Sequence, residues 1–307
     1  MSWRAGLAVL ALLATPAAAH EISQDWLVEC DNTGQCTALS LAGDVVLRVT
    51  GTAQAPVVTM TMPAAMTAAM SERLRLEGLP AHTTPGRRMR EDFVFRPTPD
   101  GLGQLTATDA AAFVQAAPAA TSAVAGSRHV SLNGLGAALA RMGREQPRDP
   151  PASPPPISGR AVTPGHLGTM RYHALVCGLG AARVGDAVSL YPLADGARII
   201  GVDCGLDGPN AGSIWLVERV AGQPKPAAFP TPDRPDEPML AGYLANSRFD
   251  PASGTLHALT LSRPQGDCGK ALVWRWTAAG FVLVEAHRMP VCAGVVQALW
   301  PRTWLAP

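Results

Sequence analysis

The chain has 307 residues, of which 47% are hydrophobic, and it carries 25 basic and 24 acidic side chains. Arg4 is the only charged residue among the first nineteen, so the rest of the chain is nearly neutral, with 24 residues of each sign. This balance argues against nucleic acid as a partner, because neutralising many phosphates requires a basic patch. The length exceeds what one hydrophobic core usually encloses, which predicts two domains.

Residues 1–19 have the pattern of a secretory signal peptide. Arg4 is followed by an apolar run from Ala5 to Ala14, and small residues close the segment at Ala19. The run is much shorter than the roughly 20 residues that a membrane-spanning helix needs, and no later stretch comes close. We therefore expect cleavage after Ala19, export to the periplasm of a Gram-negative bacterium, and no membrane span.

Two strands joined by a tight turn are predicted where the mature chain begins. In WLVEC (26–30), Trp26, Val28 and Cys30 fall on one face of a strand, because strand side chains alternate. The sequence DNTG supplies turn chemistry, and CTALSLAG (36–43) returns the chain. We expect Cys30 and Cys36 to meet across this hairpin.

Short strands are also predicted in the rest of the first half. They are runs of β-branched or aromatic residues bounded by turn residues. These runs are 43–51, 56–62, 92–97, 103–108 and 128–132. The Ala- and Met-rich stretch 63–78 instead predicts a short helix or an irregular crossing.

Two further segments predict helices. Residues 109–117 are rich in helix formers, with Asp109 as the expected N-cap. In 131–146, apolar residues recur at i, i+3, i+4 and i+7 from Leu135, which indicates an amphipathic helix. The expected first domain, residues 20–146, is a β-sandwich with one or two helices.

A proline-rich segment, residues 147–165, predicts a linker between the domains. It contains seven prolines in nineteen residues, which excludes a helix interior or a central strand. The expected second domain, residues 166–307, is an antiparallel β meander, so the fold class is mostly β with minor α. Its predicted strands are 173–177, 197–204, 213–220, 242–250, 254–263, 271–277 and 281–289.

Four of the seven tryptophans lie near the end of the chain. Trp274 and Trp276 share one face of a predicted strand, and a place in the core is favoured over a ligand-stacking platform. Trp300 and Trp304 are expected to hold the C-terminal tail against the second domain.

All six cysteines follow the predicted signal peptide, and an even number in an exported chain indicates disulfides. Sequence proximity favours three pairs among the fifteen possible connectivities. The pairs are Cys30–Cys36, Cys177–Cys204 and Cys268–Cys292. A metal site is disfavoured by the five residues between Cys30 and Cys36, and a redox site by the absence of C-x-x-C.

No motif for catalysis, cofactor binding or metal binding stands out. The loop GLGAARVG (178–185) departs from dinucleotide-loop spacing and predicts a turn. Ser131 lies outside a nucleophile elbow and is expected to cap the following helix. Asp203, Asp207 and Asp267 predict turns.

The seven histidines form no H-x-x-x-H pair, although His20, if N-terminal, would have the generic copper or zinc affinity of an amine with an imidazole.

Several motifs together resemble a bacterial exported family with six cysteines, the domain of unknown function 1176. They are DWLVECDNTGQCTA, GPNAGSIWLV, FDPASGTL, GDCG and WPRTW. SLNGLGAALARM is similar to a helix start of the family, but GREQPR after it is less acidic than the family pattern. The N-terminal half is also loosely similar to invasion-associated locus B proteins. The resemblance implies a periplasmic location and conserved disulfides, and it implies no catalytic residues.

Three functional hypotheses remain. The leading one is a non-catalytic envelope protein that binds another protein or a cell-wall component. The second is an envelope hydrolase whose site is assembled from Asp203, Asp267 and either His173 or His257. The third is a thiol-redox factor. The sequence indicates no oligomeric state.

Overall fold

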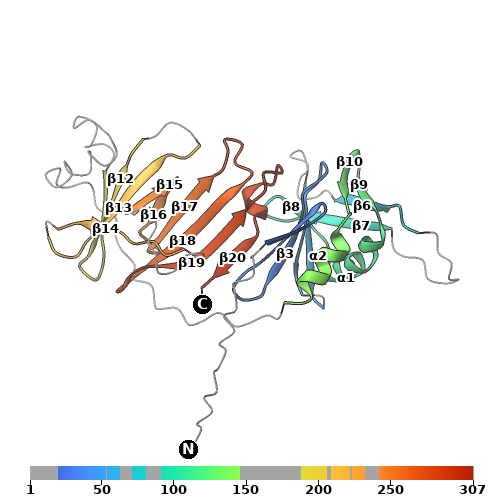
Figure 1. Cartoon of the computed structure of the whole chain (residues 1–307), viewed down its shortest axis with the longest axis horizontal. Helices are drawn as coiled ribbons and strands as arrows, with labels where there is room; N and C mark the ends of the chain where they lie inside the picture. Colours follow the sequence, from blue (N-terminus) through green and yellow to red (C-terminus); the bar gives the residue numbers. More distant parts are fainter. Residues whose placement is uncertain are drawn as a thin grey trace, which may run out of the picture.

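The computed structural model describes residues 20–306 except 53, 63–70, 81–90, 146–187, 206–208, 222 and 232–241. The predicted signal peptide and linker therefore lie outside the described residues. The described part is mostly β, as predicted, and its sheets stack along the long axis of the molecule (Figure 1). No helix in this part has the length and apolar character needed to cross a membrane.

The first half forms a ten-stranded antiparallel sheet that folds over a core containing Trp26, Phe93 and Phe113. An isolated bridge from Gly43 to Val130 joins the last strand back to the start of the sheet. The mostly β, antiparallel character predicted for this half is confirmed, and its strands form one continuous sheet. The sheet order is β1-β2-β3-β4-β5-β8-β7-β6-β9-β10. The strands are β1 (His20–Ser23), β2 (Trp26–Cys30), β3 (Cys36–Ser40), β4 (Leu47–Gly51), β5 (Pro56–Thr61), β6 (Glu72–Glu77), β7 (Asp92–Pro97), β8 (Leu102–Gln104), β9 (Ser122–Ala125) and β10 (Arg128–Ser131).

Two helices, α1 (Ala107–Ala116) and α2 (Leu135–Met142), pack on this half, and a 3-10 turn, η1 (Ala117–Ala119), follows α1. Both helices were predicted, but both expected caps were wrong. Thr106 caps α1, because its hydroxyl accepts a hydrogen bond from the Asp109 amide at 3.2 Å. The cap of α2 is Gly134, while the Ser131 hydroxyl donates to Asp25 at 2.6 Å.

The prediction of a helix or irregular crossing for 63–78 is wrong over β6. Leu74 and Leu76 are buried in the core, whereas Arg73 and Arg75 are exposed. This alternation has the period of a strand, and the Ala-rich composition of the preceding residues obscured it.

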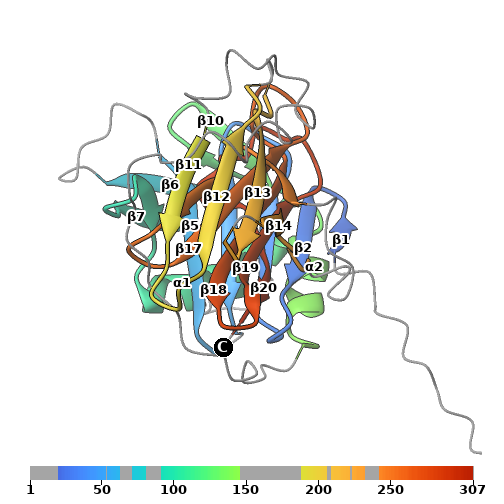
Figure 2. The ribbon, with the colours of Figure 1, turned by 90° about the vertical axis from the view of Figure 1, so that its left-hand side faces the viewer.

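The second half contains two five-stranded antiparallel sheets. One has the order β11-β12-β13-β14, with β15 also paired to β13. The other is the predicted meander, in which β16 to β20 follow one another in chain order. Figure 2 shows β11 to β13 lying over the meander. The strands are β11 (Val188–Pro192), β12 (Arg198–Asp203), β13 (Gly212–Glu218), β14 (Lys225–Pro226), β15 (Tyr243–Ala245), β16 (Arg248–Asp250), β17 (Thr255–Leu261), β18 (Gly269–Thr277), β19 (Gly280–Met289) and β20 (Arg302–Leu305), and a 3-10 turn, η4 (Gln297–Leu299), precedes β20.

The predicted strand 242–250 is in fact two strands in different sheets. Asn246, between β15 and β16, has a φ of 42°, a left-handed conformation that ends a strand. Its side chain accepts a hydrogen bond from the Ala211 amide at 2.9 Å and donates to the Leu259 carbonyl at 2.9 Å. Asn246 thus joins the two sheets at the point where the chain crosses between them.

Both faces of the meander contribute to apolar clusters. Leu272, Trp274 and Trp276 on β18 pack toward the β11–β15 sheet, which confirms the core position predicted for the tryptophans. The opposite face packs against the first half through a separate apolar cluster. Its buried members are Leu27, Leu39 and Leu102 from the first half and Cys268, Met289, Val295, Leu299 and Trp300 from the second.

Polar contacts at the edge of this cluster join the tip of the first hairpin to β20. The Asn32 side chain donates to the Leu305 carbonyl at 2.9 Å and accepts from the Leu305 amide at 2.8 Å. The Arg302 guanidinium donates to the buried Asp31 carboxylate at 2.7 Å. The DNTG turn therefore fixes the relative position of the two halves as well as closing a hairpin.

Two of the three predicted disulfides are present. Cys30 pairs with Cys36 across the β2–β3 hairpin, and Cys268 pairs with Cys292 in the second half. Cys204 is also disulfide-bonded. Cys177 lies outside the described residues, so the Cys177–Cys204 bridge stays a prediction.

Candidate ligand pocket

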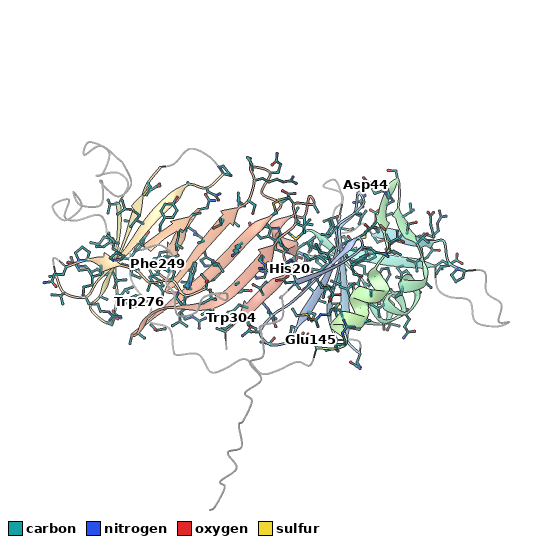
Figure 3. The ribbon with its side chains drawn as sticks, viewed as in Figure 1. His20, Asp44, Glu145, Phe249, Trp276 and Trp304 are labelled. Atoms are coloured by element: carbon teal, nitrogen blue, oxygen red, sulfur yellow. A yellow bond between two sulfur atoms is a disulfide. The ribbon has the colours of Figure 1, made fainter. Side chains whose placement is uncertain are left out.

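A pocket of about 300 Å³ lies in the second half, and its lining residue Trp276 is far from His20 of the first half (Figure 3). It lies between two hairpins, one from each sheet. The cross-strand pair Val217 and Lys225 of β13–β14 forms one wall, and the pair Trp276 and Phe281 of β18–β19 forms the other. We call it the hairpin pocket, and its lining residues are Val217, Arg219, Val220, Gln223, Lys225, Pro226, Ala227, Ala228, Trp276, Ala279, Gly280 and Phe281.

The pocket continues the hydrophobic core of the second half. Trp276, Phe281 and Ala227 are buried members of that core, and the Trp276 and Phe281 rings meet edge to face with centroids 5.1 Å apart. Val220 is 60% exposed and extends the apolar wall toward the opening. Apolar walls with a few polar groups are typical of small-molecule sites.

Arg219 joins the two hairpins beside the pocket. Its guanidinium donates to the Ala278 carbonyl at 2.8 Å and lies 5.0 Å from the centroid of the Trp276 ring. Asp195, from the β11–β12 turn, lies 3.8 Å from the same guanidinium and accepts the Trp276 indole N–H at 3.3 Å. Three turns that are distant in sequence therefore hold Arg219 and Trp276 in place.

The described residues that line the pocket carry charges of one sign. Arg219 and Lys225 are both cations, and none of the described lining residues is a carboxylate. Within the described part of the chain, no carboxylate is recorded within 4.0 Å of the Lys225 ammonium. The pocket therefore combines apolar walls with an accessible positive charge.

A comparison with protein families matches residues 150–307 to the family described as "Protein of unknown function (DUF1176)". The chain belongs to this family. No curated protein and no solved structure matches the chain. The hairpin pocket and the Cys268–Cys292 bridge lie inside the DUF1176 match. The hairpin of Cys30 and Cys36 precedes it, so the likeness of the N-terminal half to invasion-associated locus B proteins stays a resemblance.

Three of the residues considered for a hydrolase, Asp203, Asp267 and His257, are described in this DUF1176 protein, and each has other partners. Asp203 accepts the Gly205 amide at 2.9 Å, as expected for a turn residue. His257 is exposed on β17 and contacts Thr255 at 3.1 Å. No hydrogen bond or ion pair joins Asp203, Asp267 and His257 to one another, and His173 lies outside the described residues.

The structure also shows the surroundings of His20, which the sequence analysis considered for copper or zinc binding. The Nδ1 atom of His20 accepts a hydrogen bond from Arg288 at 2.8 Å at the junction between the halves, far from Trp276 (Figure 3). An arginine side chain has hydrogen-bond donors and no acceptor, so Arg288 must be the donor. The His20 Nδ1 atom is therefore already bound to the cationic Arg288 side chain. Asp207 and the loop 178–185 lie outside the described residues.

Asp267 is an ion-pair partner and a turn acceptor. Both of its oxygens accept hydrogen bonds from Arg263, and the Gly294 amide donates to it at 2.7 Å. Asp267 also lies with Cys268 and Cys292 in a group of potential metal ligands within 4.8 Å of one another. Their sulfurs already form a disulfide and the carboxylate is bound by Arg263, so these donors are engaged within the protein.

The Asp267 environment predicts a pH dependence of stability. Arg263, followed by the Gly294 amide, holds the Asp267 pKa well below its usual range. The carboxylate therefore stabilises the folded state fully above its unfolded pKa of about 3.9, and this contribution is lost as the pH falls through the lower folded value. We expect the unfolding free energy of the wild type to fall more between pH 6 and pH 3 than that of Asp267→Asn. Urea unfolding at both pH values measures this, and equal losses would contradict the assignment.

Proposed function

We propose that this DUF1176 protein is an exported recognition protein without catalytic activity that binds an envelope ligand in the hairpin pocket. The observation that carries the proposal is the pocket itself, with apolar walls from both sheets and two cations. None of Asp203, Asp267 and His257 is among the lining residues, which supports binding over hydrolysis. Export is supported by the disulfides, which persist in oxidising compartments, and none of the described cysteines is a free thiol.

The binding site can be blocked without disturbing the core. Ala228 lines the pocket and is exposed, so an indole at this position would fill the opening. Ala252, in the β16–β17 turn, is also exposed and lies outside the pocket lining, which makes Ala252→Trp the matched control.

Native mass spectrometry after incubation with a small-molecule extract of the bacterial envelope tests this. We expect the wild type and Ala252→Trp to retain the same non-covalent adduct, and Ala228→Trp to lose it. Absence of any adduct on the wild type would overturn the proposal. Equal retention by Ala228→Trp would overturn the assignment to this pocket.

A further inference from the structure

We propose that the ligand of the hairpin pocket is a small amphiphilic anion, in which one anionic headgroup is joined to a compact apolar body. This inference rests on the proposed binding function and names the chemical class that the pocket would select. It follows from the position of the two cations, the character of the walls and the size of the space.

Lys225 is the group that would bind the anion. It lies on the short strand β14 opposite Val217, so both side chains project from the same face and both line the pocket. The residue is exposed, and its ammonium has three hydrogen-bond donors. A carboxylate, sulfonate or phosphate at the mouth could accept from these donors and neutralise the charge.

Arg219 contributes to the site mainly by holding the pocket wall in place. Its contacts with Ala278, Asp195 and the Trp276 ring fix the guanidinium at the pocket wall. Because Asp195 lies 3.8 Å away, it offsets part of the Arg219 charge, whereas Lys225 has no such neighbour among the described carboxylates. Lys225 can therefore be replaced without breaking a contact that joins the hairpins.

The apolar walls of the pocket favour a ligand with an apolar body. Trp276 and Phe281, which form one wall, are almost fully buried. Val220, Pro226 and Ala228 leave apolar surface near the opening. About 300 Å³ is at the lower end of the range for small-molecule sites, roughly 300–1,000 Å³. A short acyl chain or a small aromatic group fits this space better than a sugar chain, whose hydroxyls would find few partners on these walls.

The test uses the fluorescent probe 8-anilinonaphthalene-1-sulfonate, which joins an aromatic body to one sulfonate. The folded full chain is titrated with the probe, and the bound probe is then displaced with octanoate, octyl phosphate or neutral 1-octanol. The first two competitors distinguish a carboxylate from a phosphate headgroup, and 1-octanol measures the contribution of the apolar body alone.

The chain offers a matched charge control, because Lys225 and Lys270 are its only lysines and Lys270 lies on β18 outside the pocket lining. We expect Lys225→Gln to weaken probe binding about tenfold, which corresponds to about 1.4 kcal/mol, and Lys270→Gln to leave it within about twofold. At least one charged competitor should displace the probe at concentrations at which 1-octanol does not.

The outcomes of this experiment test the proposed ligand class separately from the proposed binding function of the pocket. If 1-octanol competes as well as both anions, or if Lys225→Gln binds the probe like the wild type, the anionic class is overturned and the pocket remains a ligand site. If the wild type does not bind the probe, or if Ala228→Trp binds it unchanged, both the ligand class and the use of this pocket are overturned.

Discussion

Replacing Trp300 with alanine is expected to lower the free energy of unfolding by about 3–5 kcal/mol, the usual cost of removing a buried tryptophan. Trp300 is 2% exposed and lies in the apolar cluster between the halves, where its indole N–H donates to the Val295 carbonyl at 3.1 Å. The variant loses apolar contacts with both halves and leaves a cavity. Urea denaturation followed by circular dichroism measures the change.

Trp304 supplies the control from the same C-terminal segment. Its indole nitrogen is buried without a hydrogen-bond partner among the described residues, so Trp304→Phe removes an unsatisfied donor. We expect this change to alter stability by less than about 1 kcal/mol, because the lost ring volume and the removed donor offset each other. A loss below about 1 kcal/mol for Trp300→Ala would show that the cluster does not hold the halves together.

Arg288→Ala is expected to cost about 3–5 kcal/mol, because it removes an ion-pair partner of a buried carboxylate. Arg288 donates to the Glu29 carboxylate at 3.0 Å, and the Glu29 side chain is 0% exposed. An ion pair on the surface should behave differently. Arg75 and Glu77 form such a pair with 60% and 41% exposed side chains, so Arg75→Ala should cost less than about 1 kcal/mol.

A double replacement separates the cost of breaking the pair from the net contribution of the pair to stability. Glu29→Met with Arg288→Met removes both charges and keeps most of the side-chain volume, so we expect it to be more stable than Arg288→Ala. Chemical denaturation of the three variants measures this. If Arg288→Ala and Arg75→Ala lose equal stability, the Glu29–Arg288 pair is not buried as described.

The elements of this fold were predictable where the chain follows a simple period. Alternation in 26–30 and the DNTG turn predicted the first hairpin and its disulfide, and the predicted strands 254–263, 271–277 and 281–289 correspond to β17, β18 and β19 of the meander. Among the missed strands, β14 has only two residues, which are too few to show a period.

The packing between the halves was not predictable, because both faces of the strands involved are buried. In β2, Trp26 and Val28 pack in the first core, while Leu27 faces the second half and Glu29 is buried beside Arg288. A prediction that assigns only one face of each strand to the core expects the polar residues of the other face to be exposed. It therefore does not predict a buried acid. Its partner is 259 residues away in sequence, and no local pattern joins them.

The pocket was equally hidden from the sequence. Its lining residues come from 217–228 and 276–281, Asp195 supports Trp276 and Arg219 from a third turn, and none of these residues belongs to a motif. Trp276 was correctly placed in the core, yet it also forms part of the pocket wall.

The most direct measurement of the central claim is a crystal structure of the full chain with 8-anilinonaphthalene-1-sulfonate. We expect the sulfonate within hydrogen-bond distance of the Lys225 ammonium, and the rings between Val220 and the Trp276–Phe281 wall. Density for the probe only at other surfaces, with the hairpin pocket empty, would contradict the account.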